Sequence, residues 1–166
     1  NLVILIVVVF GFLVQGPFSL RAAYERDVAE GLARSAPTRP ISEADLAGLP
    51  PAVQRYLRNA GVVGQPRVRH VRARMHGRIR SGPDVHWMPF SAEQDNFFDG
   101  EPARLFYMTA SMFGIPFQGF HRYVGQSASM LVKVAGIAPV VDASGAEMTK
   151  AETVTLLNDM CIMAPA

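Results

Sequence analysis

The first twenty residues form one apolar block. Leu2 to Val14 is a run of thirteen residues without a polar side chain, and the first charge is Arg21. A helix rises about 1.5 Å per residue, so twenty residues just span a hydrocarbon core of about 30 Å. We therefore expect residues 1–20 to be a transmembrane anchor, with its orientation left open. A cleaved signal peptide and a buried core helix are the two alternatives.

The next segment has helical spacing interrupted by prolines. Residues 21–35 predict a juxtamembrane helix that continues the anchor, and two prolines within residues 36–40 predict a linker. Ser42 and Asp45 resemble a helix N-cap, and a short helix is expected over Pro51–Asn59. We therefore divide the chain into an anchor (1–20), a juxtamembrane helix with linker (21–47) and a domain (48–166).

From residue 68 onward the hydrophobic period falls from 3.6 to about two. Apolar residues alternate with arginines up to Ile79, with one slip at His70–Val71 that predicts a bulge. Further strands are expected over residues 87–98, 103–112, 117–124 and 128–134, and the turn sequences between them include Asp99-Gly100 and Gly125-Gln126. Such short connections exclude parallel pairing, so the five strands predict a curled antiparallel meander.

The last expected element is a helix over residues 147–162. Ser144 and Glu147 form a capping-box pattern, and Val154, Leu157 and Cys161 share the face that should pack on the sheet. The fold class is therefore α+β. A five-stranded sheet with one terminal helix leaves an unpaired edge, so we expect a C-terminally incomplete fragment.

Composition and charge narrow the function classes. The chain has 166 residues, 49% of them hydrophobic, and a net charge of +2. One cysteine excludes a disulfide framework, and the basic charge gathers in one stripe rather than over the domain, which argues against nucleic acid as a partner.

Four arginines of this stripe share a strand face and are candidates for binding an anionic lipid surface: Arg72, Arg74, Arg78 and Arg80. The alternative is a solvated face paired with acids on the next strand.

Methionine and phenylalanine side chains gather in the strand region and suggest an apolar ligand site. Methionine adapts to irregular ligands, and a few polar groups within such a surface would orient a head group. The candidate ligand-binding residues are Gln94, Met108, Met112, Phe117, Arg122 and Tyr123. The alternative is an ordinary core beneath the terminal helix.

Signatures of other chemistry are missing from the sequence. No Gly-x-Ser-x-Gly nucleophile elbow and no glycine-rich phosphate loop occurs, and the four histidines lack metal-ligand spacing. Cys161 lies in an apolar helix pattern that is typical of a small hydrophobe. We therefore assign no catalytic residue, no metal ligand and no cofactor.

Five segments together resemble a family of uncharacterised bacterial membrane-anchored proteins. They are residues 49–57 with 61–64, 87–94, 122–124, 141–147 and 157–161, and the resemblance covers about residues 49–166. It implies further strands after Ala166 and confers no catalytic residue, because the family has no established activity. Strand order is also similar to that of lipoprotein-carrier-type half-barrels, which implies a sheet curled round a helix and holding acyl chains.

The sequence thus predicts a single-pass bacterial membrane protein whose domain binds a lipid or another apolar ligand. One alternative is a structural or protein-interaction module of a membrane complex, with a protein partner added at an open strand edge. A lesser alternative is a hydrolase whose site is completed by missing C-terminal residues.

Overall fold

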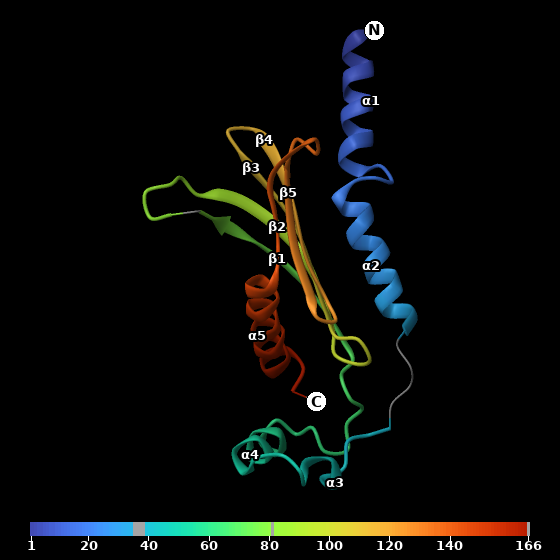
Figure 1. Cartoon of the computed structure of the whole chain (residues 1–166), viewed down its shortest axis with the longest axis vertical. Coiled ribbons are helices and arrows are strands. Elements are labelled where there is room, and N and C mark those ends of the chain that lie inside the picture. Colours follow the sequence, from blue (N-terminus) through green and yellow to red (C-terminus); the bar gives the residue numbers. More distant parts are fainter. Residues whose placement is uncertain (35–38, 81, 166) are drawn as a thin grey trace.

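Six antiparallel strands in sequential order form the centre of the protein (Figure 1). The computed structural model describes residues 1–34, 39–80 and 82–165. The strands are β1 (His70–Ile79), β2 (Met88–Phe97), β3 (Ala103–Met112), β4 (Ile115–Val124), β5 (Ser127–Val134) and β6 (Ala138–Ser144). Each strand pairs with the next, as the short connections require, so the predicted α+β meander is confirmed.

A helix lies on each side of the sheet (Figure 1). Helix α2 (Leu20–Arg34) packs on one face, and helix α5 (Ala146–Met163) packs on the other. The β1–β2 hairpin bends away to the same side as α5 (Figure 1). Because side chains alternate along a strand, each strand sends every second residue toward α2 and the others toward α5.

The main core lies on the α2 side. Leu20, Tyr24 and Val28 of α2 are buried against Leu105 and Tyr107 of β3. The approach is close at Gly31, where an added Cβ would lie 2.5 Å from Cζ of Phe97. The helix expected only as a juxtamembrane connector thus supplies core side chains of the sheet domain.

Helix α1 (Leu2–Gln15) stands apart from this core. None of its residues is buried, and eight of them from Leu2 to Val9 are between 47% and 71% exposed. The buried-core-helix alternative is therefore wrong. Among the described residues, one helical stretch, Leu2–Arg34, is long and apolar enough to cross a membrane, and a signal sequence would satisfy the same criterion. A turn at Gly16–Ser19 separates α1 from α2.

Two short helices precede the sheet. In α3 (Glu43–Leu46) the predicted cap is confirmed as a full capping box, with the Ser42 backbone N–H donating to Asp45 Oδ2 over 2.8 Å. Helix α4 (Pro51–Asn59) has the predicted bounds and begins with proline in its first turn. A bridge between Pro40 and Pro66 closes this segment.

Several local predictions are corrected. A sixth strand, β6, follows the five expected ones, and β1 and β2 pair without a register shift, so the bulge at His70–Val71 is wrong. The irregularity lies instead between Val132 and Lys133. The predicted Ser144 cap is also wrong, because Ser144 ends β6 and Gly145, with φ of 122°, precedes the helix.

Helix α5 packs with a different face from the predicted one. Val154 and Leu157 are 54% and 53% exposed, and Cys161 is exposed as well. The buried side chains are Leu156 and Glu152. The error has a physical reason: the inward face of α5 is partly polar because its carboxylates meet partners on the sheet.

Candidate functional site

The α5 side of the sheet is divided into a polar and an apolar part. The register places Gln94 opposite Phe106 and Asn96 opposite Arg104, and all four side chains are on this side. Toward the β3–β4 turn the same face carries only apolar residues, and α5 does not reach this far (Figure 1). They include Phe90, Met108, Ala110, Met112, Phe117, Val132 and Val134.

The polar part is a network centred on Arg104. Its guanidinium donates to Asp159 Oδ2 over 3.0 Å, to Glu152 Oε2 over 3.1 Å and to Gln94 Oε1 over 3.0 Å. Asp159 Oδ2 also accepts hydrogen bonds from Gln94 and Asn96. Gln94, Asn96 and Glu152 are at most 6% exposed, so these ion pairs are shielded from water. The network fastens α5 to strands β2 and β3.

His121 of β4 completes the polar part. Its Nε2 lies 3.6 Å from Glu152 Oε1, and within the described part of the chain this nitrogen has no hydrogen-bond partner. Burial lowers the pKa of His121, the Arg104 charge lowers it further, and Glu152 opposes both effects. His121 is therefore neutral near pH 7 and presents an imidazole at the boundary with the apolar part.

A second network lies on the α2 side. Asp95 is fully buried, and its carboxylate accepts hydrogen bonds from the Tyr24 hydroxyl and from Arg72 Nε, at 2.9 Å for the latter. His70 Nε2 lies 2.5 Å from Asp95 Oδ1. Burial and the hydrogen bond to Asp95 raise the pKa of Tyr24, so its hydroxyl stays protonated as a donor. A cavity of about 320 Å³ between α2 and β1 opens beside this network.

The arginine stripe divides into two pairs. Arg72 and Arg74 lie directly opposite Asp95 and Glu93 on β2, as expected for a cross-strand charge pair. Arg78 and Arg80 are exposed near the β1–β2 turn, where the Arg80 guanidinium lies 4.6 Å from the centre of the Trp87 ring. The two pairs therefore have different surroundings, and only the second is next to an exposed aromatic side chain.

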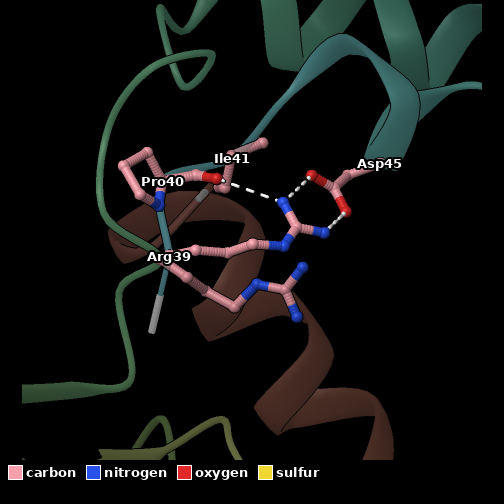
Figure 2. Close-up of a pocket in the computed structure, with 5 residues that line it drawn as sticks. Arg39, Pro40, Ile41 and Asp45 are labelled. Atoms are coloured by element: carbon pink, nitrogen blue, oxygen red, sulfur yellow. Dashed lines mark hydrogen bonds and ion pairs between the residues drawn. The ribbon is translucent and has the colours of Figure 1, made fainter. Parts of the chain in front are cut away.

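A separate hollow of about 210 Å³ lies beside α3 (Figure 2). Figure 2 shows the Arg39 guanidinium facing the Asp45 carboxylate. The two N–O distances of this ion pair are 2.5 and 2.7 Å. The Arg39 hydrogen bonds hold the pKa of Asp45 well below its usual range, with Ser42 adding to the effect. Since Asp45 also caps α3, this hollow is explained by local structure rather than by a ligand.

Five of the six predicted ligand-binding residues share the α5 side of the sheet. Met108, Met112 and Phe117 belong to its apolar part, Gln94 to its polar part, and Tyr123 bonds Thr153 of α5 over 3.1 Å. Arg122 lies on the opposite face, where its Nε donates to Asp27 over 2.6 Å. The structure therefore does not bring Arg122 together with the other five.

Sequence reasoning missed most of the polar network. The missed residues are Asn96, Arg104, His121, Glu152 and Asp159. One local signal was available: Gln94 and Asn96 are polar residues two apart on a strand, on the face that carries the apolar residues of β2. The described residues contain no group of three or more His, Cys, Asp or Glu side chains placed to hold a metal ion.

The fold and this surface define a class: an antiparallel sheet domain between two helices, preceded by a candidate membrane helix. The chain belongs to a family of unknown function, DUF6544, whose model matches residues 39–166. The match confirms the resemblance to an uncharacterised family and extends it ten residues toward the N-terminus, from 49 to 39. No curated protein and no solved structure matches the chain significantly, so the similarity to lipoprotein-carrier-type half-barrels stays a prediction.

Proposed function

We propose that this protein is a membrane-anchored domain that binds a lipid or another amphipathic ligand on the α5 side of its sheet. The observation that carries the proposal is the division of this face. Half-buried Phe90, Met108, Met112 and Phe117 form an apolar surface, and His121 with the Arg104 network adjoins it. An apolar surface with a few convergent polar groups is typical of small-ligand sites.

The membrane part of the proposal is supported by α1. This helix is apolar from Leu2 to Val14 and exposes its side chains, which is costly in water and favourable in lipid. An anchor would keep the domain at the membrane surface, where an amphipathic ligand is concentrated.

Native mass spectrometry of the full chain, released from mild detergent, tests the ligand. Solvent extraction then identifies any bound lipid. We expect a stoichiometric adduct that is lost in Met108→Asp and in Met112→Asp. The matched control is Thr109→Asp, which puts the same charge on the same strand but on the other face. Near-UV circular dichroism verifies the fold, and a folded wild-type chain without an adduct would contradict the proposal.

A second candidate function is a protein-interaction module. Helix α5 exposes Val154, Leu157 and Ile162, the last to 80%, and β6 is an edge strand of the described sheet. Exposed apolar faces and unpaired strand edges are both features of surfaces that bind proteins. A photo-crosslinking residue at Leu157 should give one reproducible protein adduct in cells, whereas the same residue at exposed Asp84 should not. Equal adduct patterns at both positions would contradict this candidate.

A further inference from the structure

The two ends of the sheet differ sharply in the chemistry of their turns. At one end, five large apolar residues that we call the apolar rim are exposed by 49–85%: Trp87, Phe113, Ile115, Ile137 and Val140. They belong to the β1–β2, β3–β4 and β5–β6 connections or lie next to them. The turns at the other end carry Asp99, Glu101 and Gln126 instead. Among the connections between strands, the large exposed apolar side chains are thus concentrated at one end of the sheet.

Two of the connections in the rim are neighbours, and the rim side chains are exposed. The His86 and Phe113 rings lie 6.5 Å apart, which joins the β1–β2 loop to the β3–β4 turn. Phe113 is 85% exposed and has a φ of 52°, in the left-handed region that is unfavourable for a non-glycine residue. A polar or glycine residue would suit water at this position better. A large aromatic side chain there points to a non-aqueous neighbour.

The last turn of α1 lies at the same end of the sheet. Gln118 Nε2 donates to the backbone oxygen of Val14 over 3.2 Å. Gly136 in the β5–β6 turn packs so closely on α1 that an added Cβ would lie 2.8 Å from Val14 Cγ2. From this contact α1 extends away beyond the end of the sheet (Figure 1). A bilayer crossed by α1 would therefore lie next to the β5–β6 turn of the rim.

The basic residues near the rim also fit contact with a lipid bilayer. Arg80 stacks on Trp87, and Arg78 near the end of β1 is also exposed. Tryptophan is enriched at membrane–water interfaces, and long basic side chains place their charge among head groups while their stems lie along apolar surface. The turns at the other end of the sheet lie farther from α1 than the β3–β4 and β5–β6 turns do, and the β1–β2 loop projects on the side of the sheet away from α1 (Figure 1).

We propose that the apolar rim inserts into the interfacial layer of the bilayer that α1 crosses. The proposal rests on the membrane anchoring proposed above and deepens it. Insertion would hold the sheet upright on the membrane and open the apolar part of its α5 side toward the lipid. A ligand could then pass between the bilayer and the sheet without crossing water.

The test places a fluorescent reporter at the rim of the full chain. Bimane is attached to Phe113→Cys in a Cys161→Ser background, because Cys161 is exposed and would also react. Ile137→Cys is a second position, in case Phe113→Cys disturbs its turn, and Gln126→Cys at the opposite end is the matched control. The protein is reconstituted into vesicles of phosphatidylcholine and phosphatidylglycerol, with and without lipids that carry a nitroxide near the head group.

We expect blue-shifted emission and loss of most of the fluorescence to the nitroxide lipid at both rim positions, and neither effect at position 126. If the chain stays in the vesicles after an alkaline carbonate wash but both rim labels report water, the rim proposal is overturned while the anchor stands. Blue-shifted emission without quenching would also overturn it, in favour of a protein contact. Release by the wash would refute the anchor itself and the rim proposal with it.

Discussion

Asp95 of β2 is a fully buried carboxylate that joins its strand to two other elements: α2 through Tyr24, and β1 through His70 and Arg72. A buried charge is stable only when its lone pairs have partners. Tyr24 is itself 1% exposed, so its hydroxyl has no access to water as a substitute donor. The local stability of the α2 side therefore depends on the Tyr24 hydroxyl.

We expect Tyr24→Phe to lower the free energy of unfolding by about 1.5–3 kcal/mol, the range for a hydrogen bond to a charged group. Urea unfolding of the full chain in mild detergent measures the change. The control is Tyr56→Phe, which removes a hydroxyl bonded to the Cys161 carbonyl at an exposed site, where water replaces the bond. Equal losses in the two variants would contradict the special role of Asp95.

The lowered pKa of His121 predicts that the stability of the folded chain depends on pH. Burial lowers its pKa in the folded chain, whereas in the unfolded chain the pKa is about 6.5. Above that value both states are neutral and stability is independent of this group. Below it the unfolded chain takes up the proton first, so stability falls as the pH drops, by at most about 1.4 kcal/mol per pH unit.

We therefore expect His121→Gln to flatten the curve of unfolding free energy between about pH 6.5 and pH 5. Glu152 and Arg104 face this imidazole and remain in the variant, so the substitution removes only the proton uptake by residue 121. The matched control is His86→Gln, at an exposed position in the β1–β2 loop, which should keep the wild-type slope. A variant at residue 121 with an unchanged slope would show that another group titrates.

At the scale of elements, α5 is the clearest departure from a simple amphipathic helix. It buries Glu152 and Leu156 and exposes Leu157, which lies one position farther along the chain. Consecutive residues on a helix point about 100° apart, so the burial of these two leucines shows which face of α5 is turned toward the sheet.

We expect Leu156→Ala to cost about 2–5 kcal/mol and Leu157→Ala to lie within about 0.5 kcal/mol of wild type. Leu156 is 7% exposed and packs with Tyr123 and Ala128, whereas Leu157 is 53% exposed. The two variants remove the same atoms, and each is therefore the control for the other in thermal or urea unfolding. A larger loss of stability in Leu157→Ala than in Leu156→Ala would support the packing face of α5 that was predicted from the sequence.

Features that depend on local sequence signals could be predicted, whereas features that depend on contacts between distant residues could not. Strand β3 and helix α4 have their predicted bounds, because alternation and the proline at the helix start are local signals. The rotation of α5 was not predictable, because it depends on Arg104, nearly fifty residues from Glu152 in sequence. A buried carboxylate cannot be distinguished from an exposed one until its partner is known. The same limit hid the polar part of the candidate site.

At the scale of the whole molecule, α2 links the membrane helix to the sheet. Its N-terminal end begins beside α1, and Leu20, Tyr24 and Val28 fill the centre of the main core. Full burial of each such side chain contributes about 1.5–3 kcal/mol, and a domain of this size has a net stability of about 5–15 kcal/mol. The family model nevertheless begins at residue 39, after the end of α2. The folding unit and the matched region thus have different starting points.

Two truncated chains test this difference. A chain that begins at Ser19 keeps all of α2, and we expect it to fold, with a cooperative thermal transition and a near-UV circular dichroism spectrum close to that of the full chain. A chain that begins at Arg39 keeps the entire matched region but loses the α2 side of the core, so Leu105, Tyr107 and Phe120 become exposed. We expect it to aggregate or to melt without cooperativity. If instead it unfolds cooperatively at the same temperature, α2 is only a connector, and the membrane end of the molecule is independent of the sheet.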